Sequence, residues 1–300
     1  MDMLNNDLIE SIVLCFGAQI GKTEAELNMI GFALHQSKAP VMMVYPTDML
    51  AKFNSEKRVQ PMITNTEPLA NMYNENASSK LELNFNTGNY MVLSGANSPS
   101  SLASRAIKYV FFDEVDKYPV FSGKEANPIK LATERTKTFV DAKHVMVSTP
   151  TVENGNIWTA FKQAHAQKEY YVPCPHCGEH QKLVFKQIKW PDEAKGNKDR
   201  IRDTAYYECV HCKKAIHDKH KMDMLRNGEW RTENEPECRV RSVGYHLSSL
   251  YSPWIAFGKV AYEFFTSKDF PDQLMNFINS WLAEPVSYTH LRAHETELHL

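Results

Sequence analysis

The stretch that decides how this chain folds reads FGAQIGKT and runs from Phe16 to Thr23. The apolar run Ile12–Phe16 before it predicts a strand, and Lys22–Gln36 after it has apolar residues at helical spacing. A strand, a glycine-containing turn and Gly-Lys-Thr opening a helix are typical of a phosphate-binding loop, although Phe16 stands where that pattern has its first glycine. By itself the segment also fits a chance Gly-Lys-Thr at a helix start.

The chemistry of such a loop follows from its backbone. Successive N–H groups form a concavity for phosphate oxygens, and the helix N-terminus adds a partial positive charge. Lys22 can reach the β- and γ-phosphates of a nucleotide, and the Thr23 hydroxyl can bind Mg²⁺. The candidate nucleotide-binding residues are Gly17, Ala18, Gln19, Ile20, Gly21, Lys22 and Thr23.

A second stretch, YVFFDEVD at 109–116, brings two carboxylates to the end of an apolar run. Open α/β sheets bind ligands at the carboxyl ends of their strands. Asp113 would hold Mg²⁺, and Glu114 would act as the general base for the attacking water. The alternative is a solvated acidic turn, but the two stretches together favour a nucleotide hydrolase.

A third stretch, VMVSTPT at 145–151, predicts a buried strand that ends in small hydroxyl residues. In motor ATPases such a strand end lies near the γ-phosphate and couples its loss to movement, which makes Ser148 and Thr149 candidates. A plain junction of strand and turn before Pro150 fits the residues equally well.

Short apolar runs alternate with helical patterns along the first half of the chain. The further runs predict strands at Val41–Tyr45, Leu81–Phe85, Tyr90–Leu93, Tyr109–Phe112 and Val145–Ser148. The second and third flank Asn-Thr-Gly-Asn and predict a hairpin. We therefore predict an α/β fold of the P-loop NTPase kind (RecA/ASCE-like), with a mostly parallel sheet flanked by helices. Near the C-terminus, 256–265 and 273–282 predict helices.

Four of the six cysteines form two Cys-x-x-Cys pairs, whereas Cys15 and Cys238 are isolated. Four thiolates at tetrahedral reach hold Zn²⁺ in a closed, structural site, and the 31 residues between the pairs must form a hairpin or loop. His176 and His211 lie inside the pairs and are interpreted as neighbours rather than ligands. The predicted zinc ligands of this small zinc-ribbon-like insert are Cys174, Cys177, Cys209 and Cys212.

Composition narrows the function only a little. The formal net charge is −2, so no basic excess supports a grip on nucleic acid through surface charge. Basic and aromatic residues interleave at 182–202, but acidic residues share that stretch and favour a solvated face. No apolar run is long enough for a membrane helix, and no signal peptide is recognisable, which points to the cytosol.

The order of motifs resembles the large subunit of tailed-phage terminases, specifically the lambda-like GpA family. The resemblance covers about residues 10–285. It is carried by GAQIGKTE, VMMVYPT, LSGANSPSSLASRAIKYVFFDEVDKYP, VSTPT, YVPCPHCGEHQKLVF, YECVHC and GYHLSSLYSPW.

This resemblance implies an ATPase that packages double-stranded viral DNA into a procapsid. It implies ATP, Mg²⁺ and structural Zn²⁺, a terminase small subunit and a portal as partners, a homo-oligomeric ring, and the host cytoplasm. Asp113 matches the Walker B aspartate, Glu114 the catalytic glutamate, and Ser148–Pro150 the coupling motif. Arg105 matches a family arginine that could stabilise phosphoryl charge, with a structural ion pair as the alternative.

Two departures from the family are visible. The loop lacks its first glycine, and the chain stops after FINSWLAEP, where the family has a metal-dependent nuclease domain. No carboxylate constellation for a nuclease is recognisable, so we expect no DNA cleavage by this chain alone. A helicase-like translocase with a zinc insert, or a zinc-dependent DNA-binding adaptor with an inert nucleotide site, are the alternatives.

The expected domain organisation has four parts. Residues 1–168 form the ATPase core, 169–235 the zinc-binding module, and 236–285 a strand and helices that pack on the ATPase core. The last fifteen residues, VSYTHLRAHETELHL, resemble translated adapter DNA and are interpreted as a non-native tail.

Overall fold

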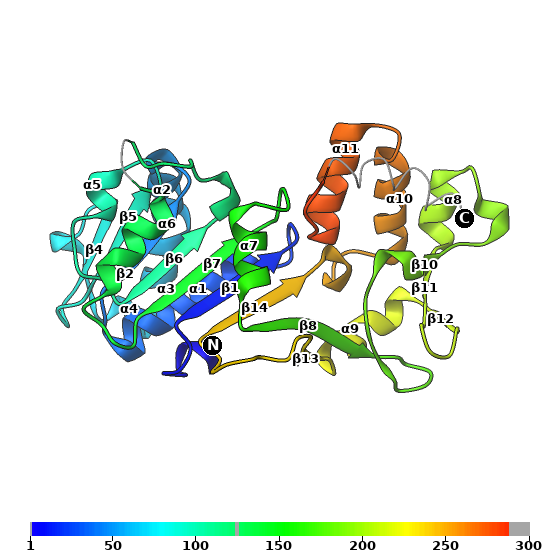
Figure 1. Ribbon diagram of the computed structural model, residues 1–300, viewed down its shortest axis with the longest axis horizontal. Helices are drawn as coiled ribbons and strands as arrows, with labels where there is room; N and C mark the ends of the chain where they lie inside the picture. Colours follow the sequence, from blue (N-terminus) through cyan, green and yellow to red (C-terminus); the bar gives the residue numbers. More distant parts are fainter. Residues whose placement is uncertain (1, 124–125, 288–300) are drawn as a thin grey trace. The chain divides into compact units, whose positions relative to one another are not determined.

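The computed structural model describes residues 2–123 and 126–287, and its chain forms two compact units (Figure 1). The first unit comprises Met1–Leu14, Gly21–Ser148 and Glu237–Val243. The second unit comprises Cys15–Ile20, Thr149–Pro236 and Gly244–Leu300. The loop identified in the sequence therefore contributes Gly17–Ile20 to the second unit and Gly21–Thr23 to the first. The expectation of a non-native tail falls almost wholly on 288–300, outside the described residues.

The first unit is built on a mostly parallel sheet, as predicted. Strand β2 pairs in parallel with β5 and β6, and β6 pairs in parallel with β7. At the far edge β4 pairs antiparallel with β5 and β3, which confirms the predicted hairpin. The strand order is β1-β7-β6-β2-β5-β4-β3. The bounds are β1 Ser11–Phe16, β2 Val41–Tyr45, β3 Tyr73–Asn74, β4 Glu82–Phe85, β5 Tyr90–Gly95, β6 Tyr109–Asp113 and β7 Lys143–Ser148.

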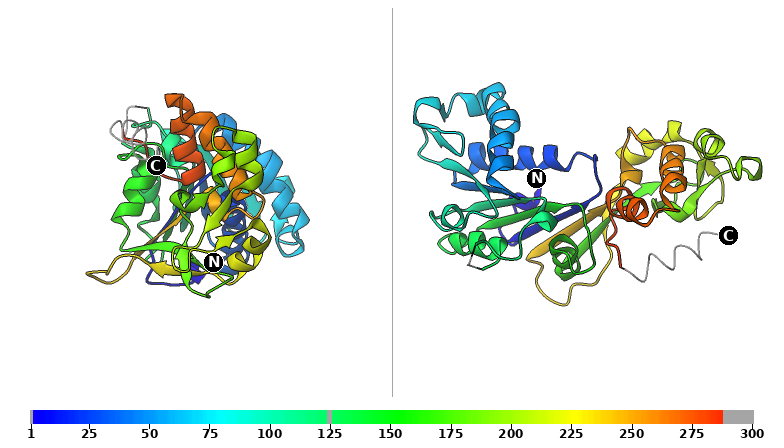
Figure 2. Two further views of the ribbon diagram at one scale, coloured as in Figure 1. Left: turned by 90° about the vertical axis from the view of Figure 1, so that its right-hand side faces the viewer. Right: turned by 90° about the horizontal axis from the view of Figure 1, so that it is seen from above.

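Helices lie on both faces of this sheet (Figure 2). Every residue of β2 and β6 is buried, as expected for strands of a parallel sheet that is covered on both sides. Thr47 caps the helix after β2 by accepting the Leu50 N–H at 3.3 Å. The helices are η1 Asp2–Leu4, α1 Lys22–Phe32, η2 Ala33–Ser37, α2 Asp48–Asn54, η3 Ser55–Val59, α3 Gln60–Asn65, α4 Glu67–Ala70, η4 Glu75–Ala77, α5 Pro99–Leu102, η5 Val115–Lys117, α6 Pro128–Thr133 and η6 Glu134–Thr136.

The second unit combines a strand layer with a helical cap. Strand β8 pairs antiparallel with β9 and β13, and β14 lies next to β8. A small antiparallel sheet, β10-β11-β12, follows β9 along the chain. The strands are β8 Ala166–Pro173, β9 His180–Lys182, β10 Ile188–Lys189, β11 Tyr206–Glu208, β12 Ala215–Ile216, β13 Glu229–Thr232 and β14 Ser242–Leu247. The helices are α7 Asn156–Gln163, η7 Phe185–Gln187, η8 Asp192–Ala194, α8 Lys198–Thr204, η9 Asp218–His220, α9 Lys221–Arg226, η10 Ser249–Tyr251, α10 Phe257–Ser267, α11 Pro271–Asn276 and η11 Phe277–Leu282.

The two C-terminal helices share one core with the cysteine-bearing segment. Phe185 contacts the rings of Phe264 and Phe277, and Tyr207 contacts Phe257. Helices α8 and α10 approach so closely that a Cβ on Gly258 would lie 1.9 Å from the Arg202 carbonyl oxygen. The structure thus groups 169–236 with 244–287 in one unit, whereas the sequence suggested two separate segments.

Candidate nucleotide site and metal centre

The first half of the loop is anchored through its backbone. The Gly17 N–H donates to the Leu247 carbonyl at 2.8 Å, and the Ala18 N–H donates to the Ser280 carbonyl at 2.7 Å. A Cβ on residue 17 would lie 2.9 Å from that Ser280 oxygen, so the close approach requires glycine. These two N–H groups, which the sequence analysis counted toward the phosphate cradle, already donate to carbonyl oxygens.

The second half of the loop belongs to the first unit and opens helix α1. Gly21 precedes the helix with φ 88°, a left-handed conformation that favours glycine. Lys22 and Thr23 are the first helical residues. The Lys22 side chain is 10 % exposed, and its Nζ lies 3.3 Å from the Glu114 carboxylate.

Asp113 ends strand β6, and its carboxyl group is buried. Among the described parts of the chain, its Oδ1 atom has no hydrogen-bond partner. Burial, and then the charge of Glu114, raise the pKa of Asp113 to about 6, against the opposing charge of Lys22. A buried carboxylate oxygen without a partner fits a hard cation such as Mg²⁺, which prefers oxygen ligands.

Glu114 follows in a left-handed backbone conformation, with φ 56° and ψ 45°. Such strain in a residue other than glycine is concentrated at functional sites. Its carboxylate contacts Lys22 and also Lys117, at 2.6 Å. Burial acts to raise the pKa of Glu114, but the charges of these lysines and their hydrogen bonds outweigh it and lower the pKa. Glu114 is therefore held as a carboxylate, the form that a general base requires.

Glu26 is a site residue that the sequence analysis missed. It lies one turn after Lys22 on α1 and is fully buried. Within residues 2–123 and 126–287, neither of its carboxylate oxygens has a hydrogen-bond partner. Burial, followed by the charge of Asp113, raises the pKa of Glu26 well above its usual range. The sequence does hold a signal for Glu26, because this carboxylate lies on the apolar helix face that Leu27 and Ile30 define.

Ser148 is the last residue of a first-unit segment, and Thr149 is the first residue of the second-unit segment that follows it in the sequence. Ser148 ends β7, is buried, and its hydroxyl accepts the Asp116 N–H at 3.4 Å. Asp116 lies two residues after Glu114, so Ser148 reaches the turn that carries the candidate base. Thr149 is the first residue of the segment that continues into the second unit.

Arg105 is engaged in an ion pair with Glu82. Its two terminal nitrogens donate to the two carboxylate oxygens at 2.7 and 2.8 Å, and its guanidinium lies 5.4 Å from the Tyr90 ring centroid. This is the structural ion pair that the sequence analysis kept as the alternative. A role at a phosphoryl group would require Arg105 to leave Glu82.

The four predicted zinc ligands come together in the second unit. Their sulfur atoms all lie within 4.8 Å of one another. The Cys174 and Cys212 sulfurs are 3.8 Å apart, and those of Cys177 and Cys209 are 3.9 Å apart. Zinc–sulfur bonds of about 2.3 Å place the corners of a tetrahedron about 3.8 Å apart, so the set fits Zn²⁺.

The surroundings of this cluster shift the pKa values of its thiols in opposite directions. For Cys209, burial acts to raise the pKa, but the backbone N–H groups of Cys212 and His211 and the neighbouring thiols lower it to about 6. Burial raises the pKa of Cys174 to about 12. The Nε2 atom of His176 lies 2.8 Å from the Ala215 carbonyl oxygen and forms a hydrogen bond there, so it is not a ligand of the cluster. The four cysteines would hold the metal in a closed site.

The fold and these residues define a class. A mostly parallel sheet with Gly-Lys-Thr at a helix start and Asp-Glu at a strand end is typical of P-loop ATPase domains. The chain belongs to the family of phage terminase large subunits of the gpA type, because residues 1–230 match the family described as "Phage terminase large subunit gpA, ATPase domain". The resemblance drawn from the motifs is confirmed.

The chain is similar to two relatives that are longer than it is. It is 25% identical over 306 residues to the terminase large subunit of Enterobacteria phage P21 and 22% identical over 305 residues to that of Escherichia phage lambda. Each alignment covers 95% of this chain and 47% of the relative, so the chain spans about half the length of these relatives. The ATPase domain of the Thermus phage P74-26 large terminase has a similar fold, with a TM-score of 0.52 and 15% identity over 92% of this chain and 88% of that one.

Residues 242–299 match a second family, described as "Terminase large subunit gpA, endonuclease domain". The motifs predict no nuclease domain in this chain, so the match to a stretch of that family corrects this expectation. In the part of the chain that the structure describes, no helix is long and apolar enough to cross a membrane.

Proposed function

We propose that this chain is the ATP-hydrolysing motor part of a terminase large subunit, which drives double-stranded DNA into a procapsid. The observation that carries the proposal is the acidic cluster Glu26, Asp113 and Glu114, which lies with Lys22 in the first unit of a chain that belongs to the gpA family. Buried carboxylates with unpaired oxygens destabilise a protein unless they bind something.

The loop residues and the Asp113–Glu114 pair each have a role in the proposed reaction. Lys22 binds the β- and γ-phosphates of ATP, together with backbone N–H groups of Gln19 to Gly21. Thr23 and Asp113 would hold Mg²⁺, which would supply positive charge next to the phosphates. Glu114 orients the attacking water and accepts its proton. Because Lys22 and Glu114 are paired at 3.3 Å, the arrival of the γ-phosphate would separate them and place both groups on the reacting atoms.

Further roles are part of the same proposal. Ser148 and Thr149 couple hydrolysis to movement, since Ser148 reaches the turn after Glu114 and Thr149 leads into the second unit. Arg105 stabilises phosphoryl charge when it leaves Glu82. Zn²⁺ on the four cysteines holds the segment around β9 to β12 together and takes no part in hydrolysis.

The proposal extends to partners and boundaries. The chain acts with double-stranded DNA, a terminase small subunit and a portal, in a homo-oligomeric ring in the host cytoplasm. It does not cut DNA by itself. Residues 1–168 form the ATPase core, 169–235 the zinc module and 236–285 the C-terminal strand and helices.

The test is steady-state ATP hydrolysis with Mg²⁺ and double-stranded DNA. Glu114→Gln should lower the rate about 10²–10⁴-fold, because a positioned general base contributes that much. Glu24→Gln is the matched control, since Glu24 lies on α1, is largely exposed and pairs with Arg58. That control should hydrolyse ATP at the wild-type rate. Equal rates for Glu114→Gln and wild type would show that the base is wrongly assigned. A wild-type chain that binds zinc but no Mg²⁺·ATP would favour the adaptor with an inert nucleotide site.

A further inference from the structure

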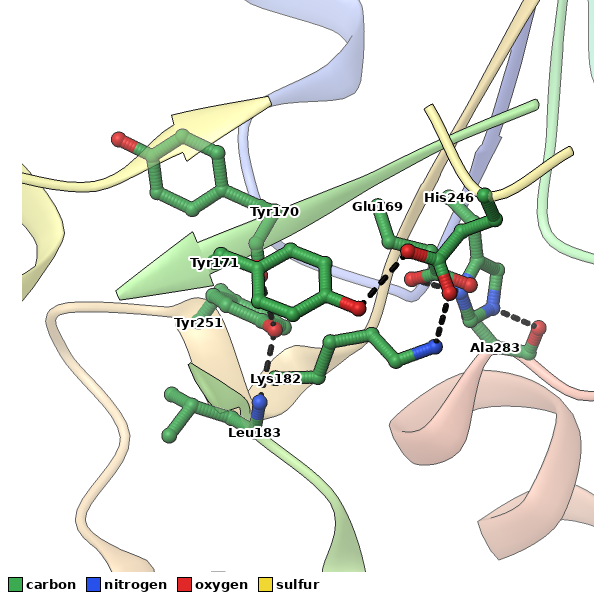
Figure 3. A network of polar contacts seen from close by, with 9 residues as sticks. Glu169, Tyr170, Tyr171, Lys182, Leu183, His246, Tyr251 and Ala283 are labelled. Atoms are coloured by element: carbon green, nitrogen blue, oxygen red, sulfur yellow. Dashed lines mark hydrogen bonds and ion pairs between the residues drawn. The ribbon is translucent and has the colours of Figure 1, made fainter. Parts of the chain in front are cut away.

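His246, on β14, ties together three segments of the second unit. Its Nδ1 atom lies 3.1 Å from a Glu169 carboxylate oxygen on β8, and its Nε2 atom lies 2.9 Å from the Ala283 carbonyl oxygen at the end of η11 (Figure 3). The ring also packs against Trp158 and Phe161 of α7, with centroids 5.9 and 5.7 Å away. The His246 side chain is only 13 % exposed.

Both partners of the ring accept hydrogen bonds, and this determines its charge. A neutral imidazole has one N–H, so it can donate to either Glu169 or Ala283, whereas the imidazolium donates to both. Burial acts to lower the pKa of His246, but the hydrogen bond to Glu169, its charge, the Ala283 carbonyl and the Glu284 charge raise it. The charged groups around the ring are Glu169 of β8, Lys182 of β9, Glu284 after η11, and Lys162 of α7, whose ammonium lies over the Trp158 and Phe161 rings.

Water has access to this ring. His246, Glu169, Lys182 and Glu284 line a cavity of about 160 Å³. A cavity of this size with polar walls accommodates several water molecules, which can carry the proton to and from the imidazole.

Two of the three segments that His246 joins, β14 and η11, also anchor the phosphate-binding loop. Leu247, the next residue on β14, accepts the Gly17 N–H. Ser280, one turn before Ala283 on η11, accepts the Ala18 N–H. The Ser249 hydroxyl lies 3.2 Å from both the Ala18 and Ser280 carbonyl oxygens and closes the same frame.

The anchored half of the loop supports a strained half. Gln19 has φ 55° and Gly21 has φ 88°, and backbone of this kind makes a nest of N–H groups for anions. Within the described residues, no backbone hydrogen bond uses the N–H groups of Gln19, Ile20 or Gly21. A left-handed Gln19 persists only where its surroundings hold it, so the loop depends on its anchors.

We propose that His246 is a positioning residue for the phosphate-binding loop: as an imidazolium it donates to both Glu169 and the end of η11, the helix that anchors Ala18, and its deprotonation leaves one N–H for these two acceptors and loosens the loop. The inference rests on the proposed ATP-binding function. The anchors Leu247, Ser249 and Ser280 fall in the stretch that matches the endonuclease family, so the frame links that stretch to Gly17 and Ala18, which fall in the part that matches the ATPase family.

The test is the affinity of the whole chain for Mg²⁺·ATP, measured by isothermal titration between pH 6 and pH 9. In the wild type, each pH unit above the midpoint lowers the imidazolium fraction about tenfold, so the apparent Kd should rise by up to about tenfold per unit. His246→Gln should bind more weakly at pH 6 and lose this pH dependence. Glu169→Gln should keep it but shift its midpoint to lower pH, because the carboxylate no longer stabilises the imidazolium.

His144→Gln is the matched control, because His144 is another largely buried histidine, on β7, and contacts Thr136 at 2.9 Å. It should reproduce the wild-type pH profile. Identical profiles for wild type and His246→Gln, or a midpoint that Glu169→Gln does not move, would overturn the inference. Titration of the His246 Cε1–H signal by NMR in the wild type gives a direct reading that needs no variant to fold, and a midpoint below about 6.5 would also overturn it. A wild-type chain that binds no ATP at any pH would instead refute the proposed function.

Discussion

The acidic cluster of the first unit and the cysteine cluster of the second unit each bring together side chains of one kind, but they do so in opposite ways. Glu26, Asp113 and Glu114 come from a helix and a strand end that the fold brings together, and buried oxygens among them have no hydrogen-bond partner in the described part of the chain. The four cysteines come from two local Cys-x-x-Cys turns whose sulfurs already stand at tetrahedral spacing. The first arrangement is open to a ligand that comes and goes, while the second is complete once one metal is bound.

The two clusters therefore differ in their effect on stability: the cysteine cluster is suited to support folding, whereas the acidic cluster is suited to bind a ligand. A closed tetrathiolate site releases binding energy into folding. Buried like charges oppose folding and are tolerated where a ligand later compensates them. Three substitutions test this difference, each in the described part of the chain.

The largest effect is expected at the cysteine cluster. Cys209→Ser should abolish the expected stoichiometry of about one zinc per chain and unfold the segment around β9 to β12, because structural zinc contributes roughly 10–16 kcal/mol. Metal analysis and hydrogen exchange of peptides from β9 to β12 check this. Cys238→Ser is the control, since Cys238 is exposed and lies outside the cluster. A metal-free chain that keeps native protection in these peptides would contradict the assignment.

A substitution in the acidic cluster should have the opposite effect on the stability of the fold. The pKa of Asp113 rises from 3.8 to about 6 on folding, which corresponds to roughly 3 kcal/mol. A raised acid pKa favours the folded state fully below pH 3.8, and this contribution is lost as the pH rises through 6. Asp113→Asn should therefore stabilise the ligand-free first unit at pH 7, and not at pH 3.5, while it abolishes ATP hydrolysis.

Hydrogen exchange of β6 and β7 peptides at pH 7 measures this change in stability. Asp141→Asn is the control of opposite sign, because a hydrogen bond from Lys108 lowers the pKa of Asp141. It should leave the first unit unchanged or slightly less stable at pH 7. Faster exchange in Asp113→Asn than in the wild type would mean that Asp113 stabilises the fold, and the comparison would fail.

The smallest effect is expected in the core that the cysteine-bearing segment shares with α10. Gly258→Ala would place a Cβ 1.9 Å from the Arg202 carbonyl, so α8 and α10 must separate, at a cost of about 1–3 kcal/mol. Urea unfolding followed by circular dichroism measures it. Gly31→Ala is the control, with its nearest neighbours at 3.5 Å and an expected gain of roughly 1 kcal/mol or less. A midpoint for Gly258→Ala equal to that of the wild type would show that the two helices are loosely packed.

Local sequence determined the parallel sheet, the cysteine pairs and the Asp-Glu pair at the end of β6, which depend on short motifs. The predicted strand Val41–Tyr45 matches β2 residue for residue, because an uninterrupted apolar run has one stable place, inside a covered sheet. The four cysteines that the sequence groups as one set do come together in the structure, and each pair is a local turn. Strand β8 was missed, since most of its eight residues are half-exposed and carry no apolar run.

Only the tertiary structure decided which polar residues lie together. Glu26 becomes part of the acidic cluster because α1 places it near Asp113, and no local pattern records that proximity. The loop motif identified Gly17 and Ala18, but their N–H groups are used by carbonyls of Leu247 and Ser280. His246 bonds residues 77 and 37 positions away in the sequence. Backbone propensity and hydrophobic pattern act over a few residues, whereas burial, charge and hydrogen-bond pairing are set by whatever the folded chain brings into contact.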